Sequence, residues 1–94
     1  MVELYNLLKT TSKISMELVD DIEYHNKFIE GIVIYFEDGT TFQICKDVDN
    51  HVSKDNSYML IDENLGVRLT VNDREKMIHE VIKLIEKRNS EIVD

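Results

Sequence analysis

The sequence predicts an α+β fold: an antiparallel sheet of four to five strands, a C-terminal amphipathic helix packed on one face, and a short N-terminal helix. Two observations support this prediction. Two pairs of strand-like segments are each joined by a turn, and the last third of the chain repeats its apolar residues at helical spacing. With 94 residues, the chain has the length of a single domain, 1–94.

A short helix is predicted over residues 2–9, where Val2, Tyr5 and Leu8 recur at helical spacing. A helix of this length is marginal alone, so we expect it to pack against the rest of the chain. We expect the polar residues 10–12 to end it.

Residues 14–24 fit two structures. Their even positions are apolar except for Asp20, which predicts a strand with an irregularity near residues 19–20. Ile14, Leu18 and Ile22 also fit one face of a helix. We favour the strand and keep the helix as the alternative.

The strongest local pattern is a β-hairpin. Two β-branched and aromatic runs, 28–36 and 41–45, flank the dipeptide Asp38-Gly39. Asp-Gly is typical of a two-residue type I′ turn, because both of its central residues need positive φ. That turn places Tyr35 opposite Phe42. The first run is apolar on both faces, so we expect it to lie inside the sheet.

A second hairpin and a helix complete the fold. Residues 58–61 and 66–70 read as two further strands that follow a polar loop. The segment 72–89 is predicted to be the amphipathic helix, with Asn72 as its N-terminal cap. We expect the tail from about residue 90 to be frayed.

The negative charge is concentrated in the middle of the chain. Residues 14–64 hold twelve carboxylates and three lysines, a local net charge of −9, within a total of −8. This balance disfavours direct binding to nucleic acid or to an anionic membrane. It favours a basic protein as partner, and the alternative is that the acids serve only solubility.

The short length, the absence of cysteine pairs, the α+β pattern and the dense acids across Glu17–Glu63 resemble one functional group of proteins. These are the small acidic inhibitors that phages make against host defence, the anti-CRISPR and anti-restriction proteins. The resemblance implies stoichiometric inhibition of a nucleic-acid-handling enzyme, without catalysis, by occlusion of its basic groove or by nucleic-acid mimicry. We expect the partner to contact these acids: Asp20, Asp21, Glu23, Glu37, Asp38, Asp47 and Asp49.

Patterns typical of metal sites are incomplete. The loop from Asp47 begins like a calcium-binding loop, but Val52 and Tyr58 occupy the positions of its glycine and its bidentate glutamate. His79 precedes a glutamate on the predicted helix, but Lys83 stands where a second zinc-binding histidine belongs. We expect neither a metal nor a cofactor.

The alternative in the enzyme class is a metal-dependent hydrolase that uses Asp20, Asp21, Glu23 and His25. In a strand, these acids fit an exposed edge better than a convergent site. Cys45 has no histidine near it in sequence, and we expect it in the core. We therefore predict no catalytic residue.

Another alternative is a small oligomeric structural or regulatory module, such as a homodimer. One long helix is too narrow to cover a whole sheet, so an apolar face is left for a second copy. That face holds either Ile32, Ile34 and Phe36 or, on the other side, Val33 and Tyr35. We find no secretory signal and no apolar run of about 18 residues, so we expect a soluble, cytoplasmic protein.

Overall fold

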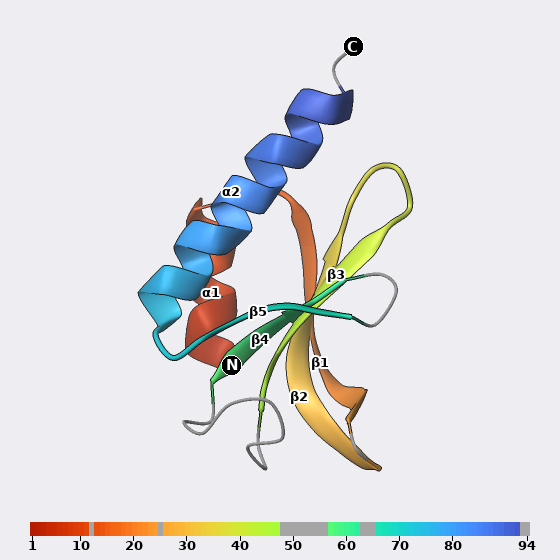
Figure 1. Ribbon diagram of the computed structural model, residues 1–94, viewed down its shortest axis with the longest axis vertical. Coiled ribbons are helices and arrows are strands. Elements are labelled where there is room, and N and C mark those ends of the chain that lie inside the picture. Colours follow the sequence, from red (N-terminus) through yellow and green to blue (C-terminus); the bar gives the residue numbers. More distant parts are fainter. Residues whose placement is uncertain (12, 25, 48–56, 63–65, 93–94) are drawn as a thin grey trace.

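The computed structural model describes residues 1–11, 13–24, 26–47, 57–62 and 66–92 (Figure 1). It has a five-stranded antiparallel sheet and two helices, which confirms the predicted α+β fold. The elements follow the chain in this order: α1 (Val2–Thr11), β1 (Ser15–Tyr24), β2 (Lys27–Tyr35), β3 (Thr41–Lys46), β4 (Tyr58–Ile61), β5 (Val67–Val71) and α2 (Arg74–Ile92).

The sheet is a meander in which each strand pairs with the next one along the chain. The order is β1-β2-β3-β4-β5, so β1 and β5 form its two edges. Both helices lie on the same side of the sheet (Figure 1). The first strand of the predicted hairpin is β2, and its pairing with β1 and β3 confirms that it lies inside the sheet.

The main core fills the space between the helices and the sheet. It includes Ile32, Ile34 and Phe36, which the oligomeric alternative offered as one candidate interface. These three side chains are buried under the helices, so they are not available to a second copy. The other fully buried members are Leu4, Leu8, Ile44, Met77 and Val81.

A second, smaller core lies on the opposite face of the sheet. Its buried members are Ile22, Cys45, Met59 and Ile61. Cys45 and Met59 alternate along their strands with residues of the main core, so they point to the other side. The structure thus places Cys45 in a core, as the sequence predicts.

An irregularity in β1 brings Ile22 into this second core. The pairing of β1 with β2 shifts between Val19 and Ile22, which confirms both the predicted strand and its predicted irregularity. A β-bulge adds a residue to one strand and increases the local twist. Ile22 follows the bulge and packs over Gly31.

The predicted register of the β2–β3 hairpin is wrong by one residue. Tyr35 pairs with Thr41 instead of Phe42, and Phe42 pairs with Ile34. The loop has three residues, 37–39. Its ends are marked by two backbone hydrogen bonds: the Phe36 amide donates to the Thr40 carbonyl, and the Gly39 amide donates to the Phe36 carbonyl. Gly39 supplies the positive φ, 88°, that follows the turn.

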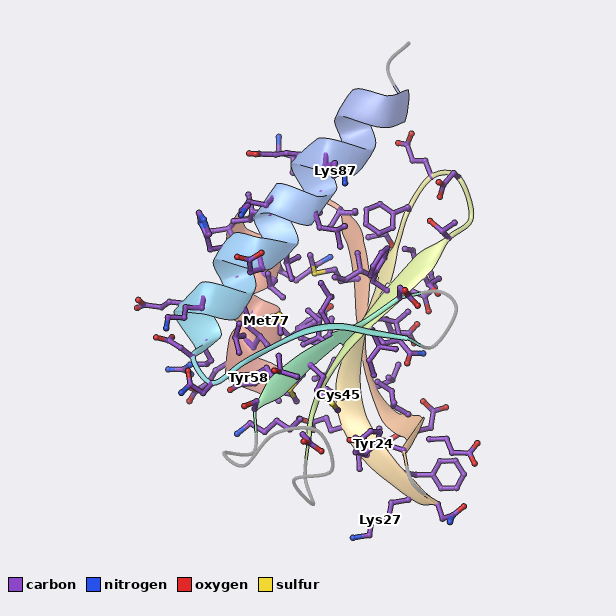
Figure 2. All side chains as sticks on the ribbon, in the orientation of Figure 1. Tyr24, Lys27, Cys45, Tyr58, Met77 and Lys87 are labelled. Carbon is purple, nitrogen blue, oxygen red and sulfur yellow. The ribbon has the colours of Figure 1, made fainter. Side chains whose placement is uncertain are left out.

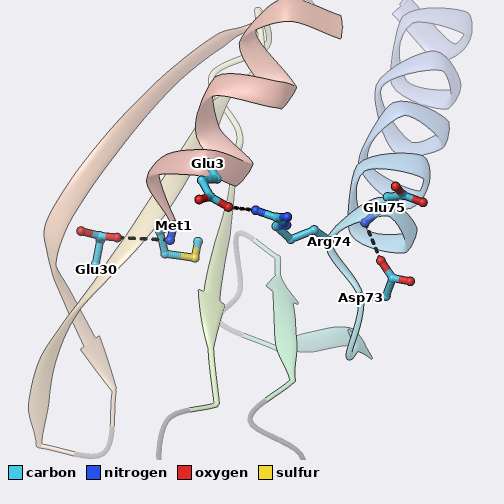
Figure 3. A network of polar contacts seen from close by, with 6 residues as sticks. All are labelled: Met1, Glu3, Glu30, Asp73, Arg74 and Glu75. Carbon is cyan, nitrogen blue, oxygen red and sulfur yellow. Dashed lines mark hydrogen bonds and ion pairs between the residues drawn. The ribbon is translucent and has the colours of Figure 1, made fainter.

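The helix ends also differ from the predicted ones. Asp73, not Asn72, caps α2, since its carboxylate accepts a hydrogen bond of 2.8 Å from the Glu75 amide (Figure 3). α2 continues to Ile92, beyond the predicted end. In α1, Thr10 and Thr11 do not break the helix, and their hydroxyls donate to backbone carbonyls of the preceding turn.

Two charged contacts tie α1 to its neighbours (Figure 3). Arg74 at the start of α2 donates to the carboxylate of Glu3. The Met1 amino group lies 3.5 Å from the Glu30 carboxylate on β2. Glu3 and Arg74 are well exposed, so we expect this contact to orient the helices more than to stabilise them.

Candidate acidic interaction surface

Edge strand β1 carries four of the carboxylates of the acidic segment. Glu17, Asp20, Asp21 and Glu23 are all exposed. Among the described residues, no basic group forms an ion pair with any of them. Carboxylates without a cationic partner present a negative potential to the solvent.

At the bulge in β1, acids from two neighbouring strands lie together. A shallow hollow of about 450 Å³ is lined by Glu17, Asp20, Asp21 and Glu30, together with two apolar residues of β1. Glu30 comes from β2, where it lies opposite the bulge. The predicted contact set omits Glu17, which lies three residues before Asp20 on the same strand, and Glu30, which only strand pairing brings to Asp20 and Asp21.

The acids of the β2–β3 loop lie beyond the start of β1, because Tyr35 at the end of β2 pairs with Ser15. Glu37 is exposed and lines a groove of about 510 Å³ with Tyr35. The Asp38 carboxylate is also exposed, but it accepts hydrogen bonds from the amide (3.0 Å) and hydroxyl (2.6 Å) of Thr40. Asp38 therefore has a structural role in the turn besides its charge.

These acids form a row along the sheet edge instead of a compact site. The row extends from Glu37 near the start of β1 to Glu23 near its end. Ten residues of extended strand span about 30 Å. A row of this length suits a macromolecular groove better than a small ligand. We call Glu17, Asp20, Asp21, Glu23, Glu30 and Glu37 the acidic edge.

Asp47 is not part of this exposed surface, although the sequence predicts it as a partner contact. Its side chain has 0% exposure. Its carboxylate accepts a hydrogen bond of 2.7 Å from the Tyr24 hydroxyl, and its amide donates to the Ser57 carbonyl. Asp47 is thus a buried structural residue. Asp49, the last of the predicted contacts, lies outside the described residues.

The pKa of Tyr35 responds to its contact with Glu17 of the acidic edge. Its hydroxyl donates a hydrogen bond of 2.9 Å to Glu17. This bond is the main cause that raises the pKa of Tyr35 above 10.0, followed by desolvation and by the charges of Glu17 and Asp21. The stabilisation linked to this shift is therefore present below pH 10.0 and is lost as the pH rises through the folded pKa.

Replacing Glu17 with glutamine should lower the pKa of Tyr35 toward its ordinary value, because both the charge and its hydrogen bond are weakened. The measurement is an alkaline titration of the tyrosine ring signals by NMR. As a control, Glu86→Gln on α2 should leave the titration of Tyr35 unchanged. A Tyr35 titration that is the same in Glu17→Gln as in the original protein would contradict this geometry.

The structure gives no support to the residues of the enzyme alternative as a metal site. In the part of the chain that is described, no three histidine, cysteine or carboxylate side chains converge as metal ligands. His25 lies outside that part, and His79 is exposed. Burial, followed by the charge of Asp47, raises the pKa of Cys45 to about 11, so its thiol stays protonated at neutral pH.

Basic side chains belong mainly to the helical layer. The sequence of α2 holds five bases and four acids, whereas residues 14–26 hold four acids and neither lysine nor arginine. The charge is therefore segregated between the sheet edge and the helices.

Neither helix in the described chain has the length and apolar character needed to cross a membrane. Comparisons with protein-family models, curated proteins and solved structures find no match.

Proposed function

We propose that this protein is a non-catalytic inhibitor whose acidic edge occupies the basic groove of a nucleic-acid-handling protein. The observation that carries the proposal is the row of exposed carboxylates along β1, which have no basic partner among the described residues. Such a row attracts the lysines and arginines that normally contact phosphates. It raises the association rate and favours basic partners over others.

The form of the edge favours docking through side chains. An edge strand exposes backbone groups that invite another strand to pair with it, and bulges and charged residues oppose that pairing. β1 has both, since Asp20 and Asp21 lie within its bulge. The partner therefore meets carboxylates at this edge instead of extending the sheet.

Inhibition then follows from occupancy. Alternate side chains along a strand, such as Asp21 and Glu23, are separated by about 6.6 Å, a spacing similar to that of successive phosphates. The bound inhibitor excludes nucleic acid because both contact the same lysine and arginine side chains of the partner. We propose that it acts in the cytoplasm at one copy per target site, as the anti-CRISPR and anti-restriction proteins that it resembles do.

The test is a tagged pull-down from a bacterial lysate at about 0.15 M salt, with parallel samples that contain excess DNA or RNA. Two variants carry matched charge changes. The edge variant is Asp20→Asn/Asp21→Asn/Glu23→Gln, and the helix variant is Glu75→Gln/Glu80→Gln/Glu86→Gln. Each raises the net charge from −8 to −5.

We expect one dominant nucleic-acid-binding protein, which the competitor displaces and which the helix variant retains. With that protein purified, the edge variant should associate about tenfold more slowly at low salt, because the steering charges are lost. The proposal fails if the two variants bind equally, or if excess nucleic acid leaves the captured protein in place.

A further inference from the structure

The β1–β2 hairpin extends beyond the helical layer. Side chains alternate along β2, so Phe28, Glu30, Ile32 and Ile34 share one face. The helices bury Ile32 and Ile34, and Glu30 lies beside the Met1 amino group at the start of α1. Phe28 comes next along this face, and its side chain is 73% exposed.

The figures place this end of the hairpin away from both helices. Lys27, the neighbour of Phe28, lies at the far end of the molecule from Lys87 on α2 (Figure 2). Nearby Asn26 has a φ of 67°, and asparagine is among the residues that most readily adopt such a turn conformation. Phe28 is therefore held on a paired strand next to a tight turn.

Phe28 is the most exposed large apolar side chain among the described residues. It belongs to a β-strand, so it is presented in a defined direction instead of by a mobile loop. Aromatic side chains in such positions are frequent anchors of protein–protein interfaces, because they bury a large area at low conformational cost.

The surroundings of Phe28 indicate what would cover it. Glu23 of the acidic edge lies directly opposite Phe28 in the strand pairing, and Glu30, which is ion-paired with the Met1 amino group, follows two residues later. A second copy of this chain would bring like charges together on this face, which disfavours self-association. A surface with an apolar pocket bordered by lysine or arginine complements both the ring and the carboxylates.

We propose that Phe28 is the apolar anchor of the acidic edge, and that the partner site combines basic side chains with an apolar pocket. This inference rests on the proposed function and deepens it. The carboxylates steer the partner and set the salt dependence, while Phe28 slows its dissociation. Nucleic-acid mimicry alone gives no role to this ring.

The test uses two synthetic peptides of equal length and equal lysine content. One has serine at its remaining positions, and the other has leucine there. Their affinities for the protein are measured by titration at low and at physiological salt. The variants are Phe28→Ala and, as a control, Leu7→Ala, which removes an apolar side chain with 43% exposure from the outer face of α1.

We expect the original protein and Leu7→Ala to bind the leucine peptide about tenfold more tightly than the serine peptide. Phe28→Ala should reduce this ratio to about two or less, and its affinity for the serine peptide should stay the same. Its thermal midpoint should also stay the same, because the ring packs on little of the protein.

Other results separate the two proposals. Salt-dependent binding of both peptides with no preference for leucine, or a preference that persists in Phe28→Ala, overturns the role of Phe28 and leaves the acidic edge intact. If neither peptide binds, the electrostatic surface fails and the anchor fails with it.

Discussion

Replacing Asp47 with alanine should lower the free energy of unfolding by about 3 kcal/mol, the largest effect that we expect from one substitution. The carboxylate has 0% exposure and accepts a hydrogen bond from the Tyr24 hydroxyl. Without it, a half-buried hydroxyl loses its acceptor.

The measurement is urea unfolding followed by circular dichroism, with the free energy taken from the midpoint and the slope. Tyr24→Phe removes only the hydroxyl that donates to this buried carboxylate and should cost about 2 kcal/mol. Asp21→Asn neutralises an exposed carboxylate and should cost less than about 0.5 kcal/mol. If Asp47→Ala were no more destabilising than Asp21→Asn, then Asp47 would not be the buried structural residue described above.

Gly31→Ala should destabilise the protein by about 2 kcal/mol, because the sheet leaves no room for a methyl group there. An added Cβ would meet the Cδ1 atom of Ile22, which packs over Gly31 after the bulge. It would also lie 2.7 Å from the carbonyl oxygen of Ile44. The side-chain atom can move aside, whereas the backbone oxygen belongs to a paired strand and cannot.

A double-mutant cycle separates these two obstacles. Ile22→Val removes Cδ1, so Gly31→Ala should cost less in that background, although the clash with the Ile44 carbonyl remains. Gly66→Ala is the control, since its added Cβ would only touch Asp62 at 3.4 Å or more. Equal unfolding free energies for Gly31→Ala and Gly66→Ala would show that the bulge does not close over Gly31.

In the β2–β3 hairpin, local sequence rules predict the two strands, but tertiary packing determines their register. The strands could be predicted because their β-branched and aromatic runs are unambiguous. Their register could not, because the Asp-Gly rule favours a two-residue loop. In the structure, Ile32, Ile34, Phe42 and Ile44 all face the helices, which the three-residue loop allows and a two-residue loop does not. A shift by one residue would turn one strand's apolar face to solvent.

The sequence could predict that the protein has an acidic surface, but not which of the acids belong to it. Asp20, Asp21, Glu23 and Glu37 are exposed, as a carboxylate usually is. Asp47 looked no different in sequence. In the structure it is buried with a hydrogen bond from the Tyr24 hydroxyl of β1, a residue 23 positions earlier in the chain. Glu30 joins the acidic edge for the same kind of reason, since strand pairing places it opposite the bulge.

The exposed ring of Phe28 was also beyond the reach of the sequence. Its position in an apolar, β-branched run predicts burial. Burial depends on how far the helices extend over β2, and they cover Ile32 and Ile34 but not Phe28. That limit is a property of the packed helices and of their contacts to the sheet.

The amino-acid sequence alone established the α+β class, the position of the helices and strands, and the acidic middle of the chain. These follow from periodicity and charge, which are local and additive along the chain. Only the tertiary structure decided the strand register, the form of the bulge, the burial of Asp47, and the exposure and neighbours of Phe28. Each of these depends on which distant residues compete for the same space, and that competition is settled only when the sheet and the helices pack together.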